Sequence, residues 1–218
     1  MRVKLISYSR VPDDSELPDD MLQLVAYCAR VSNPSNQNNT ETSEKLVKYL
    51  IKNKHWSPLE MVNVCLEIDT TRDIARQLLR HRSFTFQEFS QRYASPDEGF
   101  DEMFEKREAR LQDETNRQNS VSTDDKAVQQ YWFRIQSRVE WMAKRSYKQA
   151  LDLGIAKEQA RALLPEGLTK SRLYVNGTVR SWIHYIELRS ANGTQKEHIE
   201  LAKACGEAVY KLFPLEDR

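Results

Sequence analysis

The chain has 218 residues, with 33 Lys or Arg against 32 Asp or Glu, so its formal net charge is +1. This length suits one domain with a sizeable core, and we expect a single domain over residues 1–218. Proteins that bind long nucleic acids through phosphates carry a strong positive charge, so near neutrality argues against a nucleic-acid partner. A local basic site would therefore serve a small anion.

The cysteines and the N-terminus bear on location. Cys28, Cys65 and Cys205 are far apart, odd in number and without a CxxC pair, which predicts neither a disulfide framework nor a structural zinc site. No HExxH motif is present, so we expect no metal. MRVKLISYSR indicates a strand rather than a leader peptide, and no stretch approaches membrane-spanning length. We expect a cytoplasmic protein without a membrane partner.

The first half of the chain alternates strand and helix patterns. Hydrophobic spacing predicts, in chain order, a strand over 2–9, a turn-rich connection VPDDSELPDD, helices over MLQLVAYCARV and 43–54, a strand over VNVCLEIDT and a helix over 73–81. Residues 95–125 are polar and poor in aliphatic side chains. Two interpretations of them stay open, a mobile loop or lid and an inert solvated insertion.

The second half is mostly helical. The pattern predicts a long helix from about Asp124 to Gly154, with Ser122 and Thr123 as candidate N-caps. After it we expect a short helix over KEQARALL, an extended SRLYVNGTV, and helices over RSWIHYIELR and QKEHIELAKACGEAVYKLF. The sequence thus predicts helices around a modest sheet.

The stretch LLRHRSFTFQEFSQRY concentrates cationic, aromatic and hydrogen-bonding side chains. At helical spacing Arg72, Arg76 and Arg80 form one stripe, which would also suit a simple solvated surface. Continuing the helix would put Arg82 in the apolar arc. Either the helix ends near His81, or the Arg82 guanidinium enters a partly buried site.

A second group follows directly. If residues 88–92 are extended, the strand period points Glu88, Ser90 and Arg92 to one face. A carboxylate, a hydroxyl and a forked guanidinium suit a phosphorylated, hydrogen-bonding small molecule. A cross-strand salt bridge on an ordinary sheet face would give the same pattern, and this alternative stays open.

Arginines beside apolar residues recur near the C-terminus. In RSWIHYIELR, Arg180, His184 and Glu187 share one helix side, whereas Arg189 falls on the apolar side. Arg161 likewise interrupts ARALLP. Structural ion pairs rarely need so many arginines, so we expect them to converge on a multiply anionic ligand. The chain has 6 glycines and no GxGxxG, so any cofactor is bound without a Rossmann or Walker motif.

Arg80-His81-Arg82, seven further residues and Ser90 form a long and specific motif. It resembles the signature of the flavin-dependent thymidylate synthases. Further matches cover nearly the whole chain: HWSPLE at 55–60, SQRY at 90–93, ARALLP at 160–165, and RSWIHYIELR followed by Gln195 and Glu197. The chain departs from many relatives at Leu59, Met61, Gln87 and His184.

The resemblance implies a fold and an activity. The implied subunit is mixed α/β (α+β), with helices packed around a central, mostly antiparallel sheet, and it forms a homotetramer with shared active sites. The implied enzyme is an FAD-dependent methyltransferase that converts dUMP to dTMP. Methylenetetrahydrofolate would donate the carbon and NADPH the reducing equivalents.

The resemblance also implies residue roles. The implied dUMP-binding set is Gln77, Arg80, Glu88, Ser90, Gln91, Arg92, Arg161 and Arg189. The implied FAD-binding set is Ser57, Glu60, Arg80, His81, Arg82, Glu88, Arg180, His184 and Leu188. His55 is similar to the family histidine near the flavin ring, and it joins Arg189 as an expected catalytic residue.

The residues agree with this chemistry. Methylating uracil C5 requires added electron density, which a cysteine attacking C6 is one way to provide. Cys65 in an apolar strand and Cys205 on a helix have the pattern of packing residues instead. Arg189, among apolar side chains, would stabilise negative charge on a pyrimidine carbonyl oxygen. Ser90 has no adjacent base, so we expect it to bind substrate rather than attack it.

A function of another class stays open, a nucleic-acid-binding module that grips phosphates and stacks on bases. It would use the following side chains: Arg80, Arg82, Arg92, Phe84, Phe86 and Phe89. The near-neutral charge argues against it, and phenylalanines at this spacing also suit a core or a subunit interface.

Overall fold

The computed structural model describes residues 1–17 and 19–213, so Pro18, within the expected turn-rich connection, lies outside the described residues. Its main sheet has four strands in the order β1-β2-β6-β3. Every neighbouring pair is antiparallel: β1 (Arg2–Tyr8), β2 (Asn63–Thr71), β6 (Lys170–Thr178) and β3 (Thr85–Glu88). The expected mixed α/β class with an antiparallel sheet is confirmed.

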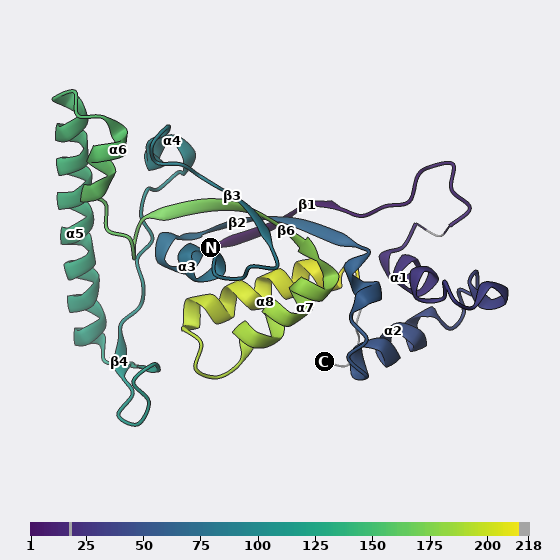
Figure 1. The fold of residues 1–218 in the computed structure, drawn as a ribbon. Coiled ribbons are helices and arrows are strands. Elements are labelled where there is room, and N and C mark those ends of the chain that lie inside the picture. Colours follow the sequence, from purple (N-terminus) through teal and green to yellow (C-terminus); the bar gives the residue numbers. More distant parts are fainter. Residues whose placement is uncertain (18, 214–218) are drawn as a thin grey trace.

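Helices cover one face of this sheet (Figure 1). α7 (Val179–Ser190) and α8 (Lys196–Tyr210) pack on each other, with α7 also against β6 and α8 against β1. α3 (Arg72–Leu78) lies against β2 and β6. Leu66, Leu173 and Trp182 are fully buried between these layers, and the Trp182 indole donates to the Val64 carbonyl at 3.0 Å. Burial of apolar surface here holds α3 and α7 in place.

The opposite face of the sheet is polar, because side chains alternate across each strand. Asp69 on β2 accepts hydrogen bonds from Arg172 on β6 at 2.6 and 2.9 Å. Arg2 on β1 pairs with Glu67 at 2.8 Å, and the Tyr174 hydroxyl donates to the same carboxylate at 2.8 Å. The charged groups of this face therefore neutralise one another.

The N-terminal helices form one end of the molecule (Figure 1). α1 (Met21–Ala29) packs on α2 (Ser43–Lys52) and on the 3-10 helix η2 (Ser57–Glu60). Between α1 and α2 lies the 3-10 helix η1 (Pro34–Asn36). The Asp20 carboxylate caps α1 by accepting from the Gln23 amide at 2.8 Å. Such capping satisfies a donor that the first helical turn leaves free.

A long helix, α5 (Lys126–Asp152), stands at the opposite end (Figure 1). Its N-cap is Asp125, whose side chain accepts from the amides of Ala127 and Val128, so the expected caps Ser122 and Thr123 are wrong by a few residues. Gly154 follows the helix with φ +81°, a left-handed conformation that glycine adopts without strain. α6 (Lys157–Ala160) and the 3-10 helix η3 (Arg161–Leu163) then return the chain toward the sheet.

The polar segment 95–125 contains regular structure, which corrects the expectation of a loop. It includes α4 (Pro96–Gly99), β4 (Arg110–Gln112) and β5 (Ser120–Ser122), and the last two form a separate antiparallel pair. Two glutamines of α5 hold its middle: Gln136 exchanges two 2.8 Å hydrogen bonds with the Arg107 backbone, and Gln129 exchanges similar ones with Ala109. In the described part of the chain, no helix is long and apolar enough to cross a membrane.

Candidate active site

The RHR motif lies in a turn at the end of α3, which we call the RHR turn (residues 79–84). α3 ends at Leu78, earlier than expected, and the amides of His81 and Phe84 donate to the carbonyls of Leu78 and His81 at 3.0 and 3.2 Å. The early end of the helix keeps Arg82 exposed, so its guanidinium enters no buried site. Arg80 is exposed as well, whereas His81 points inward and is half-buried.

His81 meets the C-terminal end of α7. Arg189 donates from Nε to the Nε2 atom of His81 at 2.9 Å, and the His81 ring packs edge-on against Tyr185 with centroids 5.0 Å apart. Burial, assisted by the charge of Arg189, lowers the pKa of His81 to about 4. The imidazole is therefore neutral near pH 7 and accepts with the lone pair of Nε2.

Gln77 on α3 belongs to a neighbouring hydrogen-bond group that sequence reasoning did not define. Its Nε2 donates to Gln195 at 2.8 Å, and its Oε1 lies 3.2 Å from Nδ1 of His198. The sequence identifies Gln195 only as a motif match and does not identify His198. A histidine among Leu201, Ala202 and Cys205 on one face of the closing helix is the signal that could have identified it.

A second cluster forms where η2 meets the N-terminal half of α7. Arg180 pairs with Glu60, and the rings of Trp56 and His184 pack edge-on with centroids 4.4 Å apart. Burial, and then the charge of Arg180, lowers the pKa of His184. His55 and Ser57 are exposed beside this cluster. Leu188, further along α7, is 59% exposed.

Glu88, Ser90 and Arg92 do not share one face, which corrects the expectation of an extended segment over residues 88–92. β3 ends at Glu88, and Ser90 starts a turn in which its carbonyl accepts from the amides of Tyr93 and Ala94. Glu88 accepts from the Ser171 hydroxyl at 2.7 Å and lies 3.5 Å from Arg72. The segment is therefore a strand end followed by a turn, and its polar side chains diverge.

Arg92 and Arg161 both contact Glu158 on α6. The Arg92 guanidinium lies 3.5 Å from the Glu158 carboxylate, and Arg161 donates to the Glu158 carbonyl at 3.2 Å. Gln91 is buried, and its Nε2 has no hydrogen-bond partner among the described residues. An orphaned buried donor of this kind costs free energy unless a ligand or water satisfies it.

Comparison with known proteins decides the family. A family model described as thymidylate synthase complementing protein matches residues 14–215. A probable flavin-dependent thymidylate synthase of Paramecium bursaria Chlorella virus 1 is 52% identical over 192 residues, which cover 88% of this chain and 87% of that protein. The chain belongs to the flavin-dependent thymidylate synthase family.

One more relative and one solved structure are similar to this chain. The flavin-dependent thymidylate synthase of Synechocystis sp. is 49% identical over 191 residues, covering 88% of this chain and 85% of the relative. A solved structure of a UMP/dUMP methylase, PolB from Streptomyces cacaoi, bound with 5-Br dUMP, superposes with a TM-score of 0.77 and 27% identity. That match covers 97% of this chain and 90% of the methylase.

The described residues suit the flavin after which the family is named. Within the described part of the chain, Arg80 and Arg82 make no hydrogen bond or ion pair, so two exposed guanidinium groups remain for a diphosphate. Trp56, the residue before η2, and His184 on α7 offer aromatic surface in the second cluster. The described residues hold no group of three or more His, Cys, Asp or Glu side chains that could bind a metal ion.

The aromatic residues of this family member argue against base stacking. Phe84 is 6% exposed and packs on Trp182 with ring centroids 4.6 Å apart, and Phe86 packs against the same core. Gly177 on β6 leaves room for the Phe84 ring, because a Cβ atom there would collide with it. Phe89 packs on Phe100 at 5.5 Å. Because these rings pack against other residues of the protein, they are not free to stack on bases. This argues against the nucleic-acid-binding interpretation.

Proposed function

We propose that this chain, a flavin-dependent thymidylate synthase by family, methylates dUMP to dTMP where α3, the RHR turn and α7 meet. The observation that carries the proposal is the contact between Arg189 and a neutral His81. An uncharged imidazole does not neutralise the guanidinium, so Arg189 keeps its positive charge for a bound anion. We also propose that residues 1–218 form a single domain.

Arg189 is the proposed activating residue for the pyrimidine. Methylation at C5 places negative charge on a carbonyl oxygen of uracil, and a half-buried guanidinium stabilises that charge more strongly than water does. His81 holds the guanidinium through its Nε2 lone pair. The remaining proposed dUMP-binding residues are Gln77, Arg80, Glu88, Ser90, Gln91, Arg92 and Arg161.

FAD is the proposed cofactor, with Arg80 and Arg82 binding its diphosphate. Other proposed contacts lie on η2, β3, α7 and the RHR turn: Ser57, Glu60, His81, Glu88, Arg180, His184 and Leu188. His55 is proposed as a catalytic residue near the flavin ring. The chemistry expected from bound FAD is hydride delivery and relay of the methylene carbon. Methylenetetrahydrofolate is the proposed carbon donor and NADPH the proposed reductant.

The cysteines support a reaction without a thiol nucleophile. Cys205 is fully buried, and burial raises the pKa of its thiol well above the ordinary value. Burial also raises the pKa of Cys28 and Cys65, both half-buried. A thiol with a raised pKa is mostly protonated near pH 7 and is a poor nucleophile. All three cysteines are free, which also supports the proposed cytoplasmic location.

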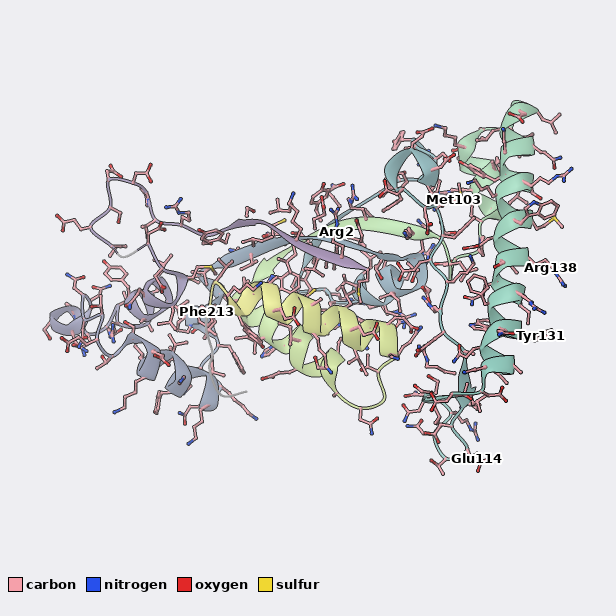
Figure 2. The ribbon with its side chains drawn as sticks, turned by 180° about the vertical axis from the view of Figure 1, so that it is seen from behind. Arg2, Met103, Glu114, Tyr131, Arg138 and Phe213 are labelled. Atoms are coloured by element: carbon pink, nitrogen blue, oxygen red, sulfur yellow. The ribbon has the colours of Figure 1, made fainter. Side chains whose placement is uncertain are left out.

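The long helix α5 supports the proposed homotetramer. Tyr131, Phe133, Trp141 and Met142 on α5 are each more than half exposed. Figure 2 shows the helix at one edge of the molecule, with Tyr131 and Arg138 labelled on it. Aromatic residues, Met and Arg are enriched in protein interfaces, so we propose that a second copy of this chain packs against α5. Exposed Arg80, Arg82 and Arg92 are consistent with sites that neighbouring subunits complete.

The first experiment is the visible absorption spectrum of the purified protein, repeated after NADPH and then dUMP are added without air. Flavin bands that NADPH bleaches, and bleaches faster with dUMP, would support the proposal. A protein that stays colourless after incubation with FAD would contradict it. Polynucleotide binding that weakens steeply with salt would then favour the nucleic-acid-binding alternative.

A further inference from the structure

A continuous series of hydrogen-bonded polar side chains runs from β4 to α3. Arg110 on β4 donates to Oε1 of Glu197 at 2.6 Å, and Gln195 donates from Nε2 to Oε2 of the same carboxylate at 2.9 Å. Gln77 donates from Nε2 to Oε1 of Gln195 at 2.8 Å, and His198 Nδ1 lies 3.2 Å from Oε1 of Gln77. These hydrogen bonds thus link the segment 95–125 to Gln77, a proposed dUMP-binding residue.

The ion pair at one end fixes the direction of every hydrogen bond. The pKa of Glu197 is lowered despite its burial, because Arg110 and other donors bind the ionised form, and an ionised carboxylate only accepts. Gln195 must therefore turn its amide nitrogen to Glu197 and its oxygen to Gln77. Gln77 in turn donates to Gln195, which leaves its own oxygen toward His198.

His198 is the last residue of this hydrogen-bonded series, and it donates to Gln77. Since Gln77 presents an oxygen, the His198 proton lies on Nδ1, and Nε2 is an acceptor without a partner among the described residues. The side chain is fully buried, and burial lowers its pKa to about 4, so the ring is neutral near pH 7. The ring packs against Tyr185 with centroids 5.7 Å apart, which restricts its rotation.

Gln77 is held at both ends of its amide and still has hydrogen-bonding capacity. An amide offers two N–H donors and two oxygen lone pairs, and Gln195 and His198 use one of each. One donor and one lone pair remain for a ligand. Without His198 only the hydrogen bond to Gln195 would hold the amide, and the positions of the remaining donor and acceptor would be less firmly fixed.

We propose that His198 and Gln195 are positioning residues that hold the Gln77 amide in one orientation for the nucleotide. The inference rests on the proposed function, because it takes Gln77 as a dUMP-binding residue. Preorganisation of this kind favours binding, since the orienting cost is met before the ligand arrives. His198 acts through Gln77, and this separates it from a residue that only fills the core.

The test is a double-mutant cycle on the FAD-loaded enzyme, with dUMP affinity measured by titration calorimetry and KM and kcat by turnover. We expect His198→Phe, which keeps an aromatic ring but no donor, to weaken dUMP binding about tenfold, the size of one lost hydrogen bond. Gln77→Ala should weaken it by at least as much. In the double variant, His198→Phe should add nothing, because the residue it positions is gone.

Leu201→Ala is the matched control, a fully buried residue on the same face of α8. It should cost stability, change dUMP affinity less than about twofold, and contribute independently of Gln77→Ala. If His198→Phe does not fold, Gln195→Leu serves in the same cycle, because Gln195 is only half-buried.

Two results would overturn the inference while leaving the proposed function intact: additive effects in the double variant, or unchanged affinity after His198→Phe. Unchanged affinity after Gln77→Ala would overturn the inference together with the proposed role of Gln77, but not the proposed conversion of dUMP to dTMP. Failure of the unaltered, FAD-loaded enzyme to bind dUMP would instead overturn the proposed function, and this inference with it.

Discussion

Arg189 and His81 lie far apart in sequence, yet Nε of the first donates to Nε2 of the second at 2.9 Å. The contact joins the end of α7 to the RHR turn. A cation held by a neutral acceptor is poised for an anionic partner, whereas a carboxylate in the same place would have cancelled the charge. This pair is the basis of the first prediction.

Arg189→Ala should abolish nearly all turnover. Loss of one charge-stabilising donor typically lowers kcat by about 100-fold or more, and here the alternative of a cysteine nucleophile is missing. The measurement is dTMP formation under saturating dUMP, with Arg189→Lys as a control that keeps the charge. Turnover of Arg189→Ala within tenfold of the unaltered enzyme would refute the role.

Ser90→Ala should retain turnover. Ser90 starts the turn after β3, and its hydroxyl accepts only a long 3.4 Å bond from the Arg92 amide. Because we expect Ser90 to bind substrate, its loss should raise KM for dUMP by about tenfold and change kcat by much less. Complete inactivity with intact dUMP affinity would instead point to a nucleophilic serine.

Acid should destabilise the fold through two histidines. The pKa values of His81 and His198 fall from the ordinary 6.5 to about 4, so below pH 6.5 the unfolded chain binds more protons than the folded one. Their contribution is fully present above pH 6.5 and is lost as the pH falls toward 4.

Urea unfolding midpoints at pH 7 and pH 5 would measure this effect. The decrease in midpoint should be smaller in His198→Phe than in the unaltered protein, because one of the two groups no longer titrates. Carboxylates contribute equally to both proteins and cancel in the comparison. An identical decrease in the two proteins would contradict the lowered pKa of His198.

Charges on α5 should disrupt assembly. Trp141 and Met142 are 57% and 54% exposed, and we expect Trp141→Glu with Met142→Lys to shift the species seen by light scattering from tetramer to smaller forms. Buried, unpaired charges weaken an interface strongly. Val31→Glu, at a position 68% exposed near α1, is the control and should leave the mass unchanged. A monomeric unaltered protein would disprove the tetramer.

Residues 116–119, with the sequence NRQN, allow a test of the lid interpretation of the segment 95–125. Asn119 lies beside β5, where its carbonyl accepts from the Asp113 amide at 3.4 Å, and Arg117 is exposed. If this segment contributes to a lid over the nucleotide, Arg117→Ala with Asn119→Ala should weaken dUMP binding severalfold without changing the unfolding midpoint. Unchanged affinity would favour the inert insertion.

The sequence by itself determined the family and the order of the longer elements. Hydrophobic periodicity is a local property, so the strands at 2–8, 63–71 and 170–178 and the helices at 43–52, 179–190 and 196–210 follow from it with errors mainly at their ends. The RHR motif identified the family because it depends on residue types at fixed spacing. The resemblance likewise supplied the antiparallel sheet, which the structure bears out.

Only the tertiary structure decided how the polar groups meet. Strand periodicity extended past Glu88 predicts that Glu88 and Arg92 share a face, but the strand ends at Glu88 and the Arg92 guanidinium lies beside Glu158 instead. The hydrogen-bonded series of Glu197, Gln195, Gln77 and His198 joins α3 to α8, and these helices are more than a hundred residues apart in sequence. Burial and hydrogen bonding between distant elements depend on packing, and no local pattern encodes them.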